Sequence, residues 1–473
     1  MKLFRDARSV TSSLAFSLAL ATVRSVLLLR ILGPALMGAW KSAFLLDTVG
    51  EFARMSFSRA MGMRVPVLDG RQDEGEARRL IATTGAFSLY LGVLLGLAVF
   101  CISFLPSNPD LRTAFRIMAA VTALGQPYFF LRELAAAHHF FHLITRETLI
   151  RSSIDFTAGL LLCAFFGLRG LGVSAVMAIV VVLLYLRHQQ KFSFGLHLDG
   201  ARLRGLLQLG VPYSLSEMTF EILRRLDVIV MAVVLGPVAV GYYGTSLLIM
   251  EFSFVLARKG VGQVVSPHLL REFGRTGSFI DAAAFYELPA RLFCYVLPPL
   301  LGVGALLIGD FVRLCLPQYA PGIPAAQITM WTMFFVALHA SINAFFVASN
   351  MILVIWRIFG VLIPFGAVAQ FAVMRAGFGL TGAAICSLTT LAIVAATEVY
   401  VARRRCGHGL GEIAGFIGSL YFPLAISIVL TVLVDLAPFA AGWKALVFLA
   451  FYAPVLLMYE LKFSILRTVR QAM

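Results

Sequence analysis

The sequence predicts an all-α polytopic membrane protein with about fourteen transmembrane helices, and three observations indicate this. Of its 473 residues, 60% are hydrophobic and 13% are charged, and the mean hydropathy is +0.89. The apolar runs are long and continuous, as spanning helices require, and do not alternate at every second residue as barrel strands do. A short motif, Leu-Gly-Pro-x-x-x-Gly, occurs at residues 32–38 and again at residues 235–241. We therefore expect two copies of one helical design.

Each expected span is an apolar window that ends at polar or turn-forming residues. The first half contains six windows, near residues 11–32, 36–58, 80–104, 112–137, 145–167 and 170–187. The second half contains six more, near residues 207–235, 238–258, 284–308, 324–348, 352–375 and 379–402, and two others follow near 414–435 and 441–461. We expect a six-helix bundle at 1–190, a second at 191–405, and two additional helices with a cytoplasmic tail at 406–473.

A second repeated motif supports the duplication. Phe-Gly-Leu-x-Gly opens the sixth expected span at residues 166–170 and the twelfth at residues 378–382. Because each copy contains an even number of spans, both copies enter the membrane from the same side. The sequence therefore predicts a parallel repeat, related by an axis along the membrane normal.

Basic residues gather in alternate connections between the spans. With the N-terminus inside, one side collects clusters such as residues 71–79 and 403–405, and the other side keeps mostly single basic residues. The positive-inside rule then predicts that both termini are cytoplasmic. This distribution also accounts for the formal charge of +15 without a nucleic-acid partner. Six scattered cysteines without a CxxC pair indicate neither a disulfide framework nor a metal site.

These features together resemble a known family. The two parallel bundles, the two repeated motifs and an arginine in the second span are similar to polysaccharide and O-antigen flippases of the multidrug/oligosaccharidyl-lipid/polysaccharide exporter (MOP) superfamily. The resemblance implies a MATE- or MOP-like fold without catalytic residues or cofactors. It also implies transport of an undecaprenyl-pyrophosphate-linked oligosaccharide across the bacterial inner membrane by alternating access. Membrane lipids, a polysaccharide polymerase and a chain-length regulator are the further partners that it implies.

Several expected spans carry charged residues in helical register. Acids and arginines share one helix face in three places: Asp47, Glu51 and Arg54; Glu147, Arg151 and Asp155; and Glu217, Glu221, Arg224 and Arg225. One interpretation is that these residues only neutralise one another. The other is that arginines line a water-filled cavity between the bundles and bind pyrophosphate, which their planar donors suit. The candidates are Arg24, Arg54, Arg132, Arg151, Arg224, Arg225 and Arg291.

Carboxylates in the same spans are candidates for energy coupling, because partial burial lets a carboxyl group bind a proton near neutral pH. The sequence leaves open whether the coupling ion is a proton or sodium. By its depth we expect Glu398 to be interfacial, and we expect His339 to be a packed polar residue. The candidates for coupling are Asp47, Glu51, Asp155, Glu217, Glu221 and Asp227.

Two other functions are compatible with the composition. A cation-coupled multidrug exporter of the same superfamily would need an apolar, acidic cavity, which the surplus of intramembrane arginine disfavours. A membrane glycosyltransferase or polysaccharide polymerase would need acidic residues in a sizeable external loop. The expected external connections are short and contain only Asp110, Asp310 and Asp435 as acids.

Overall fold

The computed structural model describes residues 2–256, 279–349 and 351–463, and this part of the chain contains helices and turns but no strand. Ten helical stretches within it are long and apolar enough to cross a membrane. Two of these, Phe16–Gly70 and Phe141–Gln189, each hold two of the expected spans. The expected spans near residues 207–235 and 238–258 correspond to shorter consecutive helices. The prediction of an all-α polytopic membrane protein is confirmed.

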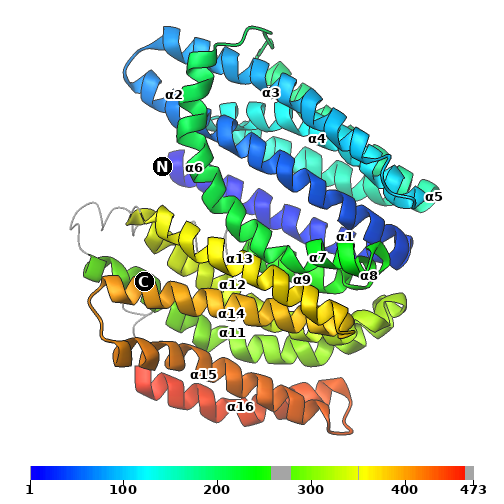
Figure 1. Cartoon of the computed structure of the whole chain (residues 1–473), viewed down its shortest axis with the longest axis vertical. Coiled ribbons are helices and arrows are strands. Elements are labelled where there is room, and N and C mark those ends of the chain that lie inside the picture. The colour runs from blue at the N-terminus through cyan, green and yellow to red at the C-terminus, as the bar shows by residue number, and fades with distance from the viewer. Residues whose placement is uncertain (1, 257–278, 350, 464–473) are drawn as a thin grey trace. The chain divides into compact units, whose positions relative to one another are not determined.

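The chain packs as two compact units, and the first comprises Met1–Met218 together with Gly236–Gly241. It contains α1 (Lys2–Arg54), α2 (Ala60–Gly70), α3 (Glu74–Ile102), α4 (Pro109–Ala137), α5 (Phe141–Gln189) and α6 (Gly200–Arg224) as far as Met218. A π-helical turn, Met55–Arg59, joins α1 to α2. α4 packs against α1, α3 and α5, and α1 also packs against α5 (Figure 1). Buried side chains of α2, α3, α4, α5 and α6 form an apolar core of this unit.

The repeated motifs place a glycine at each change of direction. Gly33 interrupts α1 with φ 70°, and Gly167 interrupts α5 with φ 57°. In the second copy, Gly236 has φ 84° and Gly379 has φ 54°. Residues with a Cβ atom rarely adopt this left-handed conformation, which glycine enters without steric cost. The same backbone reversal therefore occurs at equivalent places in both copies, as the repeat predicts.

The two Leu-Gly-Pro turns also pack against each other inside the first unit. A Cβ atom at Gly38 would overlap the backbone carbonyl oxygen of Pro237, and a Cβ atom at Gly241 would overlap that of Pro34. Each glycine thus makes room for the proline carbonyl of the other turn. The contact is reciprocal. The last position of each motif must be a glycine because a Cβ atom there would collide with the other motif.

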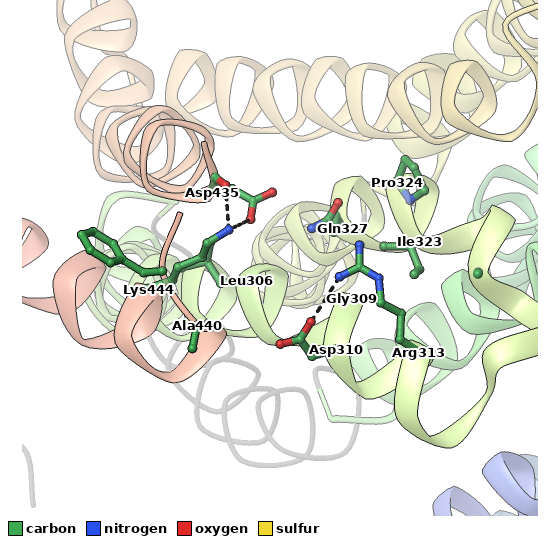
Figure 2. A pocket seen from close by; sticks show the side chains of 12 residues that line it. Leu306, Gly309, Asp310, Arg313, Ile323, Pro324, Gln327, Asp435, Ala440 and Lys444 are labelled. Atoms are coloured by element: carbon green, nitrogen blue, oxygen red, sulfur yellow. Dashed lines mark hydrogen bonds and ion pairs between the residues drawn. The ribbon is translucent and has the colours of Figure 1, made fainter. Parts of the chain in front are cut away.

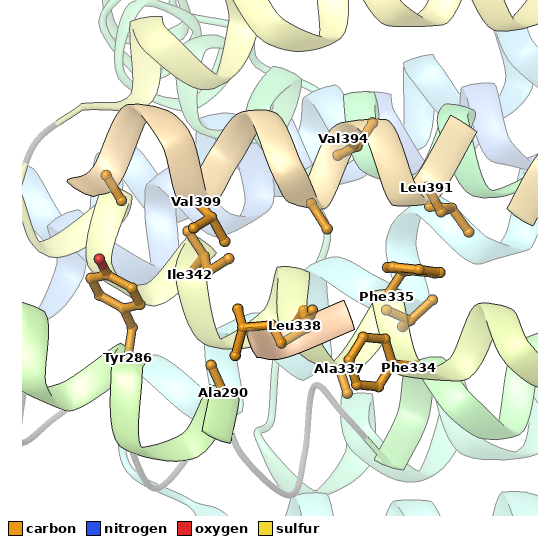
Figure 3. Close-up of a cluster of buried hydrophobic side chains, with 14 of the residues drawn as sticks. Tyr286, Ala290, Phe334, Phe335, Ala337, Leu338, Ile342, Leu391, Val394 and Val399 are labelled. Carbon is orange, nitrogen blue, oxygen red and sulfur yellow. The ribbon is translucent and has the colours of Figure 1, made fainter. Parts of the chain in front are cut away.

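The second unit comprises Thr219–Leu235 and Tyr242–Met473. Its described helices are α7 (Leu226–Val234), α9 (Gly244–Leu256), α11 (Phe279–Cys315), α12 (Ile323–Ala348), α13 (Ile352–Arg375), α14 (Gly379–Arg405), α15 (Leu410–Asp435) and α16 (Ala441–Phe463). The short α8 (Pro237–Tyr242) contains the turn residues that pack with the first unit. Figure 3 shows side chains of this core, among them Phe334 and Leu338 of α12, Val399 of α14 and Ala290 of α11.

The two C-terminal helices are joined to this core by hydrogen bonds to backbone carbonyls. Ser427 of α15 donates to Pro298 of α11 at 2.7 Å, and Tyr421 donates to Ala392 of α14 at 2.7 Å. Tyr452 of α16 donates to Pro423 of α15 at 3.1 Å. α15 and α16 are therefore packed as part of the second unit, although they lie outside the sequence repeat. The expected division at residues 190 and 405 remains a prediction.

We predict that Gly241→Ala destabilises the protein by about 1–3 kcal/mol, because the added methyl group collides with a backbone carbonyl that cannot rotate away. Thermal unfolding of the purified protein in detergent measures this. The matched control is Gly418→Ala in α15, where the added Cβ meets nothing within 4 Å. That change should leave stability equal or slightly higher, since alanine favours a helix more than glycine. Equal unfolding temperatures for the two variants would contradict the reciprocal contact.

Candidate functional site

Six polar side chains from three helices form a continuous line in the first unit, which we call the α5 polar row. Arg151 and Asp155 lie one turn apart on α5, with Arg151 Nε 3.8 Å from Asp155 Oδ2. Arg24 of α1 approaches the same carboxylate, with Nη1 3.5 Å from Oδ2. One acid is therefore shared by two arginines on different helices. The row consists of Arg24, Tyr128, Arg132, Glu147, Arg151 and Asp155.

The other half of the row is organised by Glu147, which is buried. Tyr128 of α4 donates a hydrogen bond to Glu147 Oε1 at 2.5 Å, and Arg132 Nε lies 3.4 Å from Glu147 Oε2. The guanidinium of Arg151 lies over the Tyr128 ring, with its central carbon 5.1 Å from the ring centroid. Such cation–π contact holds the guanidinium plane while leaving its outer N–H groups available. Tyr128 thus links the two halves of the row.

The three arginines of the row remain accessible although the acids hold them. Their side chains are 25% (Arg24), 34% (Arg132) and 39% (Arg151) exposed. The Nε of Arg24 is buried and has no hydrogen-bond partner among the described residues. With three cations and two carboxylates, the row has a net positive charge. An accessible cationic row within membrane spans needs water or an anion to compensate it.

A second ion pair in the first unit is largely shielded by the surrounding helices. Arg54 Nη2 lies 2.8 Å from Asp47 Oδ2, and Thr122 of α4 donates to Asp47 Oδ1 at 2.9 Å. Gln126 donates to the carbonyl of Gly50 at 3.0 Å, which brings α4 close to α1. The Arg54 side chain is only 13% exposed. Here the interpretation of mutual neutralisation describes the geometry well.

In the second unit, Glu221 binds both neighbouring arginines. Arg224 Nη2 lies 2.6 Å from Glu221 Oε1, and Arg225 Nε lies 2.5 Å from the same oxygen. The Arg224 side chain is only 5% exposed. Arg291 of α11 places its guanidinium carbon 5.5 Å from the ring centroid of Phe416. The predicted arginines are therefore divided between the two units: four belong to the first unit and three to the second.

Asp227 is buried and accepts hydrogen bonds from two side chains of the second unit. Tyr243 donates to Asp227 Oδ2 at 2.8 Å, and Ser387 of α14 donates to it at 3.0 Å. Ser387 in turn accepts a bond from Gln370 of α13 at 2.9 Å. Of the other coupling candidates, Glu51 is half-buried on α1, and the side chain of Glu217 lies outside the described part.

The expectation that Glu398 is interfacial stays a prediction, and the structure adds that its side chain is enclosed by protein. Glu398 is fully buried in the second unit, and His339 Nδ1 lies 2.9 Å from its Oε1. The His339 ring stacks on Phe220, with centroids 3.6 Å apart. The position of Glu398 near the end of the twelfth expected span predicted a site near a membrane interface. Burial of its side chain depends on how the helices pack, which that position does not show. A histidine and a glutamate on different helices, 59 positions apart, give no local signal for such a pair.

Residues 27–271, over half of the chain, match the family described as "Polysaccharide biosynthesis protein". No curated protein matches the sequence.

Solved structures resemble the chain over most of its length. The lipid II flippase MurJ in an inward closed conformation has a TM-score of 0.73 at 12% identity, covering 95% of this chain and 97% of that one. An outward-facing multidrug resistance MATE transporter of the MOP superfamily has a TM-score of 0.63 at 14% identity, covering 85% and 95%. The Vibrio cholerae MATE transporter VcmN has a TM-score of 0.61 at 13% identity, covering 89% and 98%. The fold is therefore that of MOP superfamily transporters, as predicted from the sequence.

We predict that Arg54→Gln destabilises the protein by about 3–5 kcal/mol, because it leaves Asp47 buried without its cation. The double variant Asp47→Asn with Arg54→Gln should recover part of this loss, since no charge is then left alone. Thermal unfolding in detergent compares the two. Arg78→Gln, which breaks a fully exposed ion pair with Glu74, serves as the control and should change stability by less than about 1 kcal/mol. A double variant no more stable than Arg54→Gln would exclude charge neutralisation as the role of this pair.

Proposed function

Because the chain belongs to the polysaccharide biosynthesis protein family, we propose that it is a flippase for an undecaprenyl-pyrophosphate-linked oligosaccharide. The substrate is the repeat unit of an O-antigen, capsule or exopolysaccharide. The chain moves it across the bacterial inner membrane, with both of its own termini cytoplasmic, and works beside a polysaccharide polymerase and a chain-length regulator. The observation that carries this proposal is the α5 polar row, which holds three accessible arginines within membrane-spanning helices.

The geometry of the row suits a pyrophosphate headgroup. Arg132 and Arg151 contact their acids through Nε, so their terminal nitrogens remain for a ligand. Arg24 uses Nη1, and its buried Nε has no hydrogen-bond partner in the described structure. Guanidinium groups bind phosphate oxygens in pairs and stay charged at all physiological pH values. The isoprenoid tail needs no polar site, because it stays in the hydrocarbon of the bilayer.

Exchange of partners provides a way to release the substrate. Asp155 holds both Arg24 and Arg151, so a bound pyrophosphate competes with this carboxylate for both cations. When the carboxylate returns to the arginines, the headgroup leaves on the opposite side of the membrane. Protonation of Asp155, or a sodium ion bound to it, would favour the substrate-bound arrangement. We keep the other candidate acids, Asp47, Glu51, Glu217, Glu221 and Asp227, as alternative coupling sites.

Two rival functions are less well supported. A multidrug exporter takes up cations, which the net positive row would repel. A glycosyltransferase or polymerase needs acidic catalytic groups in a sizeable external loop. The described connections on the expected external side are short: residues 103–108, a 3₁₀ turn at Pro317–Gly322, and residues 436–440. They leave no room for a catalytic domain in the described chain.

We predict that Arg24→Gln, Arg132→Gln and Arg151→Gln each lower the flipping rate about tenfold, because each removes a charge-assisted hydrogen bond to phosphate. Proteoliposomes with lipid-linked oligosaccharide measure this through the fraction of sugar that a membrane-impermeant glycosidase reaches. Arg78→Gln, far out on the exposed start of α3, is the matched control and should flip at the parent rate.

Three outcomes would overturn the proposal. A lengthened sugar chain would identify a polymerase. Export of a cationic dye without movement of the lipid-linked sugar would identify a drug exporter. Parent-like flipping by all three arginine variants would remove the α5 polar row from the transport path.

We predict that Asp155→Asn strengthens substrate binding and slows flipping. Without the competing carboxylate, Arg24 and Arg151 are free for phosphate, so we expect polyprenyl pyrophosphate to bind several-fold more tightly. Release should become slow, and the flipping rate should fall. Equilibrium binding and flipping are measured on the same preparation. Weaker binding in this variant would contradict partner exchange and indicate that Asp155 only positions the arginines.

A further inference from the structure

A cavity of about 460 Å³ lies in the second unit where the end of α11, the start of α12 and the turn between α15 and α16 meet (Figure 2). Its size falls within the range of small-molecule sites. Leu306 and Ile323 supply apolar surface, and Gln327 of α12 supplies an amide. The turn between α15 and α16 completes the wall. Because these two helices lie outside the repeat, part of the cavity wall is built by residues that the duplicated design does not include.

Two ion pairs reach the cavity from different sides. Arg313 of α11 places Nη1 3.2 Å from Asp310 Oδ1. Lys444 of α16 places Nζ 2.9 Å from Asp435 Oδ1 and donates to the Asp435 backbone carbonyl at 2.7 Å. In Figure 2, Gln327 lies between the two pairs. Its amide nitrogen donates to the carbonyl of Ala305 at 3.2 Å, which fixes the orientation of the side chain.

The charge balance of the cavity selects against ions. Two cations face two carboxylates, so neither a pyrophosphate nor an organic cation gains net attraction. Each pair nevertheless presents both hydrogen-bond donors and acceptors, because one oxygen of each carboxylate and several N–H groups of Arg313 lie outside the contact just described. Sugar hydroxyl groups donate and accept at the same time, and their ring C–H groups pack on apolar side chains such as Leu306 and Ile323.

We infer that this cavity is a saccharide subsite that binds part of the sugar chain of the lipid-linked substrate. The inference rests on the proposed flippase function and adds to it a second point of recognition, made of different residues from the α5 polar row. By the expected orientation, the cavity lies at the external ends of its helices, the side to which the proposed flippase delivers the sugar. The α5 polar row thus recognises the headgroup, and the cavity recognises the sugar.

The test fills the cavity from Gly309 of α11. A Cβ atom there would lie 3.5 Å from Ile323 Cγ2 and 4.0 Å from Gln327 Nε2, so Gly309→Ala is accommodated and Gly309→Phe projects a ring into the cavity. Binding to the full-length protein in nanodiscs is measured with two probes: polyprenyl pyrophosphate carrying a tetrasaccharide, and the same lipid without sugar. We expect Gly309→Phe to weaken the first probe about tenfold and to leave the second unchanged. Gly309→Ala should match the parent with both probes.

The two probes separate failure of the subsite from failure of the function. If the parent binds both probes equally and Gly309→Phe changes neither, the subsite is refuted while the flippase proposal stands. If the parent binds neither probe, the flippase proposal is refuted and the subsite with it. Equal weakening of both probes by Gly309→Phe would indicate general distortion and would also refute the subsite.

A photo-crosslinking residue identifies the occupant independently of affinity. Placed at Ala440, which lines the cavity, it should capture lipid-linked sugar in proteoliposomes that also contain phosphatidylethanolamine. Leu314, exposed on the same end of α11 but not part of the lining, is the control position and should capture phospholipid only. Adducts at Ala440 that contain phosphatidylethanolamine and no sugar would assign the cavity to a lipid headgroup and overturn the inference.

Discussion

The pairing of charges inside the membrane governs the rest of the structure. An ion in hydrocarbon without a partner costs several kcal/mol, so every intramembrane acid of the α5 polar row lies against an arginine or a tyrosine hydroxyl. These pairs fix which face of α1, α4 and α5 points toward its neighbours. The ion pairs differ in how much of the arginine side chain remains exposed. Asp47 and Arg54 satisfy one another and hold helices together, whereas the arginines of the row keep donors accessible.

A carboxylate shared by two arginines has chemical consequences that an isolated pair does not have. Neither Arg24 nor Arg151 can be fully neutralised by Asp155, because one acid compensates only one positive charge. The remaining charge must be balanced by water or by an anionic ligand. The pyrophosphate headgroup of the proposed substrate is an anion of this kind.

Local sequence signals account for the helices and their turns. Apolar windows predicted the spans, and a glycine before a proline predicted the breaks at Gly33 and Gly236, since both signals act within a few residues. Spacings of three or four residues also predicted the pairing of Glu221 with Arg224 and Arg225. Charge pairs between helices were not predictable in this way, because membrane helices are apolar on most faces and periodicity does not show which face meets which neighbour. His339 with Glu398, and the cavity beside Lys444, depend on such packing.

The interlocked turns bear on how the two halves of the chain have diverged. Once a duplicated gene is fused, each copy drifts independently wherever its residues contact only their own half. Gly38 and Gly241 are not free to do so, because each accommodates a backbone carbonyl that belongs to the other copy. Selection acting on one turn therefore acts on both. This accounts for a glycine at the last position of the Leu-Gly-Pro-x-x-x-Gly motif in both halves.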